Sequence, residues 1–294
     1  MSATARERVL VGVPELVADL QLGTAPDPTA GAPVLLDVRW ALGMTDGHER
    51  YLAGHLPGAV YVDLATELAA EPSEDQGRHP LPSASSFQAS ARRWGVRRGS
   101  RVVVYDTVGG TSAARAWWLL RYFGVDDVRI LDGGLPAWVR AGQALEVGEV
   151  EREHGDVVAH PGRLPVLDAD EAAELAEDGV LLDARAGERY RGETEPVDPR
   201  AGHVPGAVSA PTADNLADDG TFLPDAVLRE RFADLGVSAG AAVDGVGVYC
   251  GSGVTAAHEV AALACAGVPA ALYPGSWSQW SNDASRPVAT GPRP

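Results

Sequence analysis

Short runs of consecutive apolar residues recur along the chain and alternate with longer segments of mixed polarity. Such runs are typical of strands that are buried on both faces of a parallel sheet. Flanking glycines, prolines and acidic residues bound most of the runs. We expect strands at residues 34–37, 101–105, 128–131, 180–183, 246–249 and 271–273.

Two of the mixed segments have clear helix ends. Residues 112–123 are followed by Gly124, and residues 254–266 are followed by Gly267 and then Pro269. A glycine just past the last turn, with a proline close behind, is a typical stop signal for a helix. Strands that alternate with helices predict an α/β fold in which helices cover both faces of a parallel sheet.

The second half of the chain repeats the first. Four blocks recur in the same order, which indicates two copies of one domain. We expect a first domain at residues 1–145, a linker at 146–164 and a second domain at 165–294. The paired blocks are 34–39 with 180–185, 54–59 with 202–207, 103–106 with 247–250, and 133–138 with 275–280.

The amino-acid composition excludes several classes of partner and cofactor. The net charge is −17, from 41 acidic and 24 basic residues, and every basic residue is arginine. Such acidity argues against a nucleic acid or membrane partner. The lack of lysine excludes a Schiff base, pyridoxal phosphate and a Walker-type phosphate loop. No CxxC or HExxH motif occurs, so no metal is expected. Without a signal-like or membrane-spanning apolar segment, we expect a cytoplasmic protein.

The two copies differ where the strand of residues 246–249 ends. The second copy has Cys250 there, and the first has Asp106 at the matched position. The cysteine follows a predicted parallel strand and precedes a helix, where free N–H groups favour negative charge. Gly251 and Gly253 allow the loop to turn these groups toward one point. We therefore expect a thiolate nucleophile at Cys250.

Other interpretations of this loop are weaker. A buried structural cysteine suits Cys265, in its alanine-rich helix, better than Cys250. Residues 251–256 match a GxGxxA dinucleotide motif, but no acidic residue follows at the next strand end. A phosphatase loop would need arginine where Ala256 stands. A disulfide between the cysteines is excluded, because a helix would separate them by about 22 Å.

The repeated blocks and the cysteine loop of residues 250–255 together resemble the tandem-domain rhodanese-type sulfurtransferases over nearly the whole chain. In that family the second domain carries the active cysteine and the first is a degenerate copy, as Cys250 and Asp106 suggest. The uncharged loop of residues 250–255 resembles the 3-mercaptopyruvate sulfurtransferase branch. Thiosulfate sulfurtransferases typically carry basic residues in this loop, which suit a donor whose charge lies at the sulfur.

The resemblance also implies roles for residues outside the cysteine. Arg189 and Arg200 match the family's substrate arginines, although the spacing before Arg200 departs from the family pattern. Ser252 matches a proton relay, and Asp63 and His79 match first-domain residues that reach the active site. Loop residues expected to contact substrate are Gly251, Gly253, Val254 and Thr255.

Structural roles are the alternatives for these residues. Arg189 could form a surface ion pair with Glu193 or Glu195. Helix capping or turn formation would explain Ser252, Asp63 and His79 equally well. Residues that recur in both copies, although only one copy has the cysteine, are expected to hold the fold; these are Asp37, Asp183, His55 and His203.

The implied activity moves a sulfane sulfur from 3-mercaptopyruvate, through a persulfide on Cys250, to a thiol such as thioredoxin or to cyanide, and releases pyruvate. No metal or organic cofactor is expected. One alternative is the same chemistry with thiosulfate as donor. Another is a non-catalytic persulfide carrier, which would turn over small donors slowly. A dehydrogenase would require nicotinamide binding.

Overall fold

The computed structural model describes residues 3–22, 31–237 and 245–294, which form two compact units. The units do not follow a single cut in the chain. Unit 1 contains Met1–Leu68, Pro82–Arg163 and Asp218–Phe222, and unit 2 contains Ala69–Leu81, Leu164–Ala217 and Leu223–Pro294. Each unit thus includes a short segment from the other half of the sequence.

Unit 1 is built on a five-stranded sheet in the order β1-β5-β4-β2-β3, and every strand pair is parallel. Its strands are β1 (Leu10–Val11), β2 (Val34–Asp37), β3 (Val60–Tyr61), β4 (Val102–Tyr105) and β5 (Val128–Leu131). Its helices are η1 (Arg6–Arg8), α1 (Val13–Leu22), α2 (Gly47–Ala53), α3 (Leu64–Glu67), α4 (Ala84–Arg93), α5 (Ala113–Tyr122) and α6 (Gly134–Arg140).

Unit 2 has a four-stranded parallel sheet in the order β7-β6-β8-β9. An isolated parallel bridge joins Val166 to Leu272, where β1 pairs with β5 in unit 1. Its strands are β6 (Val180–Asp183), β7 (Val208–Ser209), β8 (Val246–Tyr249) and β9 (Ala271–Leu272). Its helices are α7 (Ala169–Asp178), α8 (Gly187–Tyr190), η2 (Thr212–Asn215), α9 (Asp225–Asp234), α10 (Thr255–Ala266) and α11 (Ser276–Asn282).

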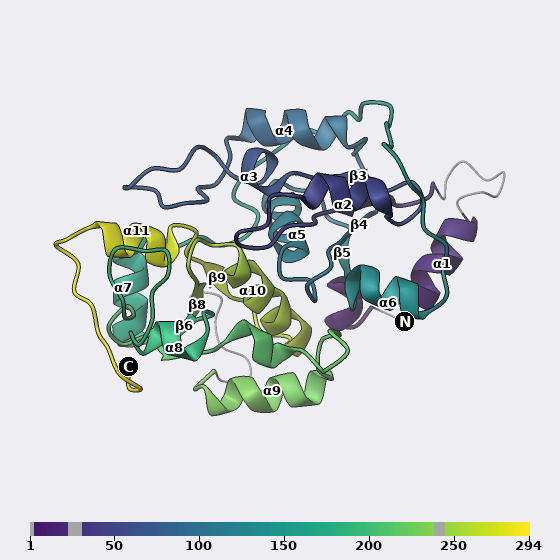
Figure 1. Ribbon diagram of the computed structural model, residues 1–294. Coiled ribbons are helices and arrows are strands. Elements are labelled where there is room, and N and C mark those ends of the chain that lie inside the picture. The colour runs from purple at the N-terminus through teal and green to yellow at the C-terminus, as the bar shows by residue number, and fades with distance from the viewer. Residues whose placement is uncertain (1–2, 23–30, 238–244) are drawn as a thin grey trace. The chain divides into compact units, whose positions relative to one another are not determined.

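Helices cover both faces of the sheet in unit 2. On one face, α7 and α11 enclose a core with Leu181, Tyr249 and Trp277. On the other, α10 contacts β8, β9 and α9 (Figure 1). Strands buried on both faces need apolar residues at every position, which is why their sequences do not alternate. The predicted α/β class, with parallel sheets flanked by helices, is therefore confirmed.

The predicted helices at 112–123 and 254–266 correspond to α5 and α10. Gly267 ends α10 with φ +84, a left-handed conformation that costs a glycine little. Four predicted strands, 34–37, 128–131, 180–183 and 246–249, match β2, β5, β6 and β8 residue for residue.

The repeated Asp-x-Arg blocks form buried ion pairs at the strand ends. Arg185 Nη2 lies 2.6 Å from Asp183 Oδ2 and donates to the carbonyl of Gly202. In unit 1, Arg39 pairs with Asp37 at the same distance. The histidines of the Gly-His blocks, His55 and His203, each bond a tyrosine carbonyl through Nδ1. These contacts join the strand ends to the neighbouring turns inside each unit.

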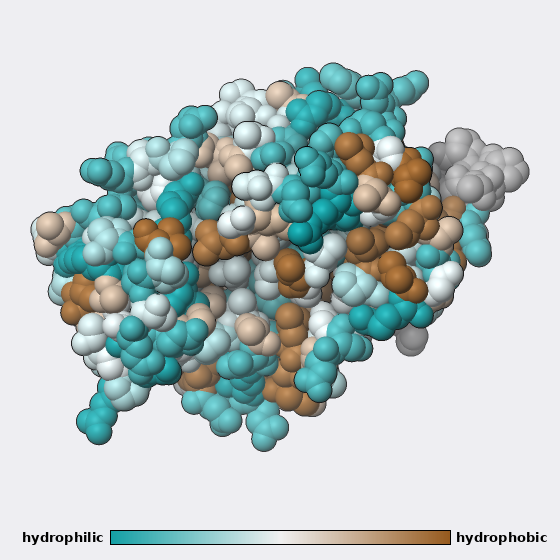
Figure 2. Space-filling view, viewed as in Figure 1, coloured by the Kyte–Doolittle hydropathy of each residue, from teal (hydrophilic) through white to brown (hydrophobic). Residues whose placement is uncertain are grey.

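Hydrophilic residues are interspersed with smaller hydrophobic groups on the face shown in Figure 2. Across the described parts of the chain, no helix has the length and apolar character needed to span a membrane.

Candidate active site

Cys250 lies directly after β8, in a loop that leads into α10. Its side chain is buried, and the backbone N–H of Gly253 donates to Sγ at 3.2 Å. Gly253 has φ +78, and a Cβ there would lie 2.5 Å from the carbonyl oxygen of Pro274. Only a glycine fits this conformation and this close approach. The loop therefore turns a backbone donor toward the sulfur because position 253 has no side chain.

The first turn of α11 holds the cysteine loop in place. The backbone N–H groups of Trp277 and Ser278 donate to the carbonyls of Cys250 and Gly251, both at 2.9 Å. The N–H of Cys250 donates to the Ser276 hydroxyl at 3.2 Å. With its backbone groups bonded in this way, the nucleophile is positioned before any substrate arrives.

The matched loop of unit 1 surrounds an acidic side chain, that of Asp106, with backbone donors. Both oxygens of the Asp106 carboxylate, which is fully buried, accept backbone N–H bonds within the loop. Burial raises the pKa of Asp106, and the N–H donors act in the opposite direction. This fold therefore supplies donors to negative charge at the position that Cys250 occupies in unit 2. The four donors are Val108 at 2.9 Å, Gly110 at 2.8 Å, Ser112 at 2.8 Å and Ala113 at 3.0 Å.

Two guanidinium groups lie beside Gly251, the residue after the cysteine. A Cβ on Gly251 would lie 3.1 Å from Arg78 Nη2 and 3.3 Å from Arg189 Nη1. Arg189, which the family resemblance predicts to be a substrate arginine, lies in α8. Arg78 was not singled out from the sequence; its position next to His79 was the available signal. It belongs to Ala69–Leu81, which is part of unit 2.

Two nearly buried acids hold these arginines. Glu195 Oε1 lies 2.6 Å from Arg189 Nη2, so one alternative for Arg189, an ion pair with Glu195, is present in the structure. Asp198 pairs with both Arg78 and Arg189. Burial raises the pKa of Asp198, while the nearby guanidinium of Arg78 acts against this increase. The charges next to the cysteine therefore form an organised cluster of ion pairs, in which Glu195 also pairs with Arg185 at 3.4 Å.

Ser252 and His79 meet in this site. The serine hydroxyl lies 2.7 Å from Nδ1 of His79, and the serine is buried. A hydroxyl bonded to an imidazole, two residues from a thiol, has the chemistry of a proton relay. The structure thus brings Ser252, His79 and Arg189 to the loop of Cys250.

Arg200 has a different position from the substrate role expected for it. Its guanidinium donates to four backbone carbonyls at and just beyond the C-terminal end of α11, at 2.6 to 2.8 Å. These carbonyls lack helix partners, and a cation there also favours the helix dipole. Arg200 therefore caps α11, and its donors are used within the protein. The four carbonyls belong to Trp280, Ser281, Asp283 and Arg286.

The remaining predicted residues have local roles in the structure. Asp63 is the N-cap of α3 in unit 1, where Oδ1 accepts from the N–H of Thr66 at 3.0 Å. Val254 is the N-cap residue of α10, and Thr255 is the first residue of that helix. Among the residues that the structure describes, no group of three or more His, Cys, Asp or Glu could hold a metal ion.

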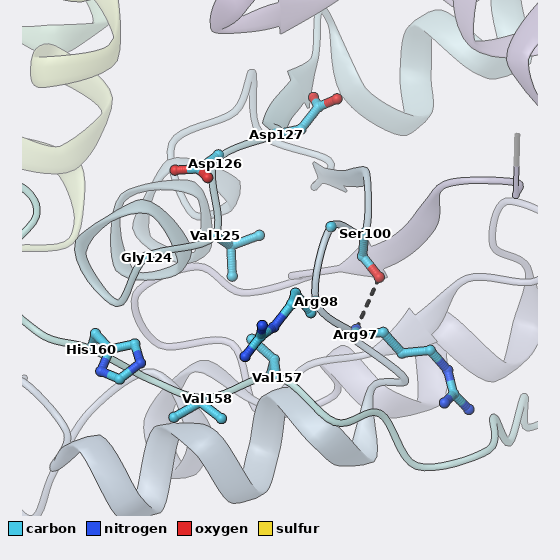
Figure 3. Close-up of a pocket in the computed structure, with 11 residues that line it drawn as sticks. Arg97, Arg98, Ser100, Gly124, Val125, Asp126, Asp127, Val157, Val158 and His160 are labelled. Carbon is cyan, nitrogen blue, oxygen red and sulfur yellow. Dashed lines mark hydrogen bonds between the residues drawn. The ribbon is translucent and has the colours of Figure 1, made fainter. Parts of the chain in front are cut away.

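A separate pocket of about 260 Å³ lies in unit 1, before the first residues of β4 and β5. Figure 3 shows Asp126 and Asp127 on one side of it and Arg98 and His160 on the other. In parallel α/β sheets, ligands bind beyond the carboxyl ends of the strands. This pocket lies at the amino ends, so it is not the counterpart of the Cys250 site.

Two named proteins are similar to this chain over most of its length. A protein of Mycobacterium tuberculosis, provisionally named thiosulfate sulfurtransferase SseB, is 49% identical over 98% of this chain and 99% of its own. A protein of Pseudomonas aeruginosa, provisionally named 3-mercaptopyruvate sulfurtransferase, is 48% identical over 88% of this chain and 92% of its own. The two names differ in the sulfur donor.

The fold and the family model agree with these relatives. The crystal structure of SseA from Escherichia coli, described as a 3-mercaptopyruvate sulfotransferase, matches with a TM-score of 0.77 and 35% identity. It covers 91% of this chain and 98% of SseA. The rhodanese-like domain model matches residues 25–141 and 168–283. The chain therefore belongs to the rhodanese family and contains two rhodanese-like domains in tandem.

Proposed function

We propose that this protein is a sulfurtransferase that carries sulfur from 3-mercaptopyruvate, through a persulfide on Cys250, to a nucleophilic acceptor. The observation that carries the proposal is the arrangement around Gly251. A cysteine with a backbone N–H on its sulfur lies next to a guanidinium of Arg189. Nucleophile and carboxylate-binding group are thus adjacent, as a short α-keto acid thiol requires.

In the first half-reaction, the Cys250 thiolate attacks the sulfur of 3-mercaptopyruvate. An S–S bond forms and the C–S bond breaks, so the electron pair goes to the methylene carbon and leaves a pyruvate enolate. The proton of the donor thiol passes to this carbon and gives pyruvate. Ser252, bonded to His79 at 2.7 Å, is the relay that we propose for this proton.

In the second half-reaction, an acceptor attacks the outer sulfur of the persulfide, and Cys250 leaves as a thiolate. Cyanide would give thiocyanate, and a thiol, for example that of thioredoxin, would take the sulfur as its own persulfide. The N–H of Gly253 stabilises negative charge on the sulfur of Cys250 in both halves of the cycle. No step requires a redox cofactor, because the two electrons that the donor sulfur gives up on becoming a persulfide stay on the carbon that becomes the methyl group of pyruvate.

Charge around the cysteine favours 3-mercaptopyruvate over thiosulfate. The loop of residues 250–255 has no charged side chain. The cations Arg78 and Arg189 are offset by Glu195 and Asp198. Thiosulfate is a dianion with charge next to the attacked sulfur, so a site with little net positive charge binds it weakly. A single carboxylate two carbons from the sulfur needs only local guanidinium groups.

We expect kcat/KM for 3-mercaptopyruvate to exceed that for thiosulfate by at least about 100-fold, because the donors differ in charge at the reacting sulfur. Thiocyanate formation with cyanide as acceptor measures both, with Cys250→Ser to subtract background. A preference for thiosulfate would show that loop charge does not set donor choice. Slow turnover with both donors, together with a stable persulfide, would indicate a carrier protein.

Replacing Ser252 by alanine is expected to lower kcat with 3-mercaptopyruvate by about 10- to 100-fold, because a proton relay is lost. Persulfide formation from thiosulfate should change less than about threefold, since sulfite leaves without needing a proton. Single-turnover kinetics with the two donors measures the difference, and Ser285→Ala, at an exposed position, is the control. Equal losses with both donors would instead assign Ser252 a structural role.

A further inference from the structure

We propose that Arg78 is a second guanidinium that binds the donor's carboxylate beside Arg189, and that Asp198 occupies this position until the donor displaces it. The proposal rests on the proposed function, because it concerns a sulfur donor that carries a carboxylate. It gives Arg78 and Asp198 roles in specificity, and it leaves Arg200 as a helix cap.

The two arginines lie beside the nucleophile loop. Both guanidinium groups approach Gly251, with Arg78 Nη2 at 3.1 Å and Arg189 Nη1 at 3.3 Å from the place of a Cβ. Gly251 follows Cys250, so its Cα lies about 3.8 Å from that of the cysteine. A donor whose sulfur contacts Cys250 therefore has both guanidinium groups within reach of its carboxylate.

Asp198 already binds both arginines. Its Oδ1 pairs with Arg78 Nη1, and its Oδ2 lies 3.3 Å from Arg189 Nη2. The carboxylate thus bridges the two cations with one oxygen on each. A substrate carboxylate would satisfy the same two donors in the same manner. Asp198 consequently marks the binding position and competes for it.

Displacement of Asp198 would affect the two arginines differently. Arg189 keeps Glu195 as a partner at 2.6 Å, so its guanidinium stays oriented. Arg78 Nε is buried and has no hydrogen-bond partner among the residues that the structure describes. Displacement of Asp198 therefore releases Nη1 of Arg78 for an oxygen of the incoming carboxylate.

The backbone that carries Arg78 is fixed. Its N–H donates to the Ser278 hydroxyl at 3.1 Å. Gly77, with φ +87, lies so close to Gly275 that a Cβ would be 2.6 Å from the carbonyl oxygen. This packing brings the segment against the N-terminal end of α11. Because the backbone is held, exchange of Asp198 for a donor needs movement of Asp198 alone.

The test compares two donors that differ in one group. Mercaptoacetone has the thiol and ketone of 3-mercaptopyruvate but a methyl group in place of the carboxylate. We expect Arg78→Gln to lower kcat/KM for 3-mercaptopyruvate about 100-fold and to change that for mercaptoacetone less than about threefold. Arg191→Gln is the matched control, because Arg191 follows α8 and pairs with exposed Glu193; it should leave both values unchanged.

Asp198→Asn tests the competition itself. Removal of the competing charge should lower KM for 3-mercaptopyruvate by about 3- to 10-fold and leave KM for mercaptoacetone unchanged. A higher KM for 3-mercaptopyruvate would overturn the competitor role, because Asp198 would then be needed to orient Arg78. Equal losses for both donors in Arg78→Gln would overturn the carboxylate role of Arg78.

Binding of pyruvate separates this proposal from the proposed function. Pyruvate carries the carboxylate but no sulfur, and calorimetry measures its binding without turnover. We expect pyruvate to bind the Arg78→Gln variant at least about 10-fold more weakly than it binds the wild-type protein. Unchanged pyruvate binding would refute the role of Arg78 even in an active enzyme. Weakened binding in a protein that forms no persulfide would support the site and reject the proposed reaction.

Discussion

Cys250→Ser is expected to reduce sulfur transfer by more than about 10⁴-fold, because the covalent intermediate cannot form. A serine hydroxyl is a far weaker nucleophile than a thiolate near neutral pH, and it cannot carry a sulfane sulfur. The fold should be unaffected, since the Gly253 N–H that now donates to Sγ can donate to a serine oxygen instead. Thiocyanate formation and mass spectrometry of the donor-treated protein measure the two losses.

Cys265→Ala provides the matched control for this variant. Cys265 is also buried, but it lies near the end of α10, the helix that begins just after the nucleophile loop. Its removal should leave kcat/KM within about twofold of wild type, because it lies near the end of α10 that is remote from the nucleophile loop. Substantial activity in Cys250→Ser, or loss of activity in Cys265→Ala, would reject Cys250 as the nucleophile.

Asp106→Asn is expected to lower the free energy of unfolding of unit 1 by about 2–4 kcal/mol. The carboxylate of Asp106 accepts N–H bonds on both oxygens, from Val108 and Gly110 on one and from Ser112 and Ala113 on the other. An asparagine has one acceptor oxygen, and its NH₂ group would face two backbone donors. Two buried N–H groups would then lack acceptors, although the side chain keeps its size.

Urea unfolding measures the loss, and hydrogen exchange localises it. Faster exchange is expected for amides of β4 and α5, which flank the loop, and not for those of β8 and α10 in unit 2. Asp126→Asn is the control, because Asp126 is exposed on the same unit. An unfolding midpoint equal to that of wild type would show that the loop does not depend on an anion.

The sequence was sufficient to predict the sheet cores and to single out a candidate nucleophile. Apolar runs located β2, β5, β6 and β8 because strands buried on both faces leave a continuous signal. The two-residue strands β1, β3 and β7 were not predicted, because so short a run has no periodicity, whereas β9 was located within the apolar run of residues 271–273. Cys250 stood out because the matched position of the other copy is Asp106, a contrast available within one chain.

The missing parts of the candidate site depend on contacts that are distant in sequence. Arg78 and Asp198 are 120 residues apart and meet only because Ala69–Leu81 packs in unit 2. Arg200 was assigned to substrate by resemblance, yet the carbonyls of α11, about 80 residues later, take up its guanidinium. A long side chain can reach several partners, and local sequence does not say which one it meets.

The exchange of short segments between the two halves also bears on how such a chain can evolve. A shortened gene for residues 165–294 would keep Cys250 but lose Arg78 and His79, which Ala69–Leu81 brings to the nucleophile loop. Unit 1 would in turn lose Asp218–Phe222, where the N–H of Phe222 donates to Asp132 at 2.8 Å. The first copy has no cysteine of its own, yet its deletion would remove residues that the second copy uses. Selection that maintains these contacts can therefore preserve both copies of the domain, although only the second contains a cysteine.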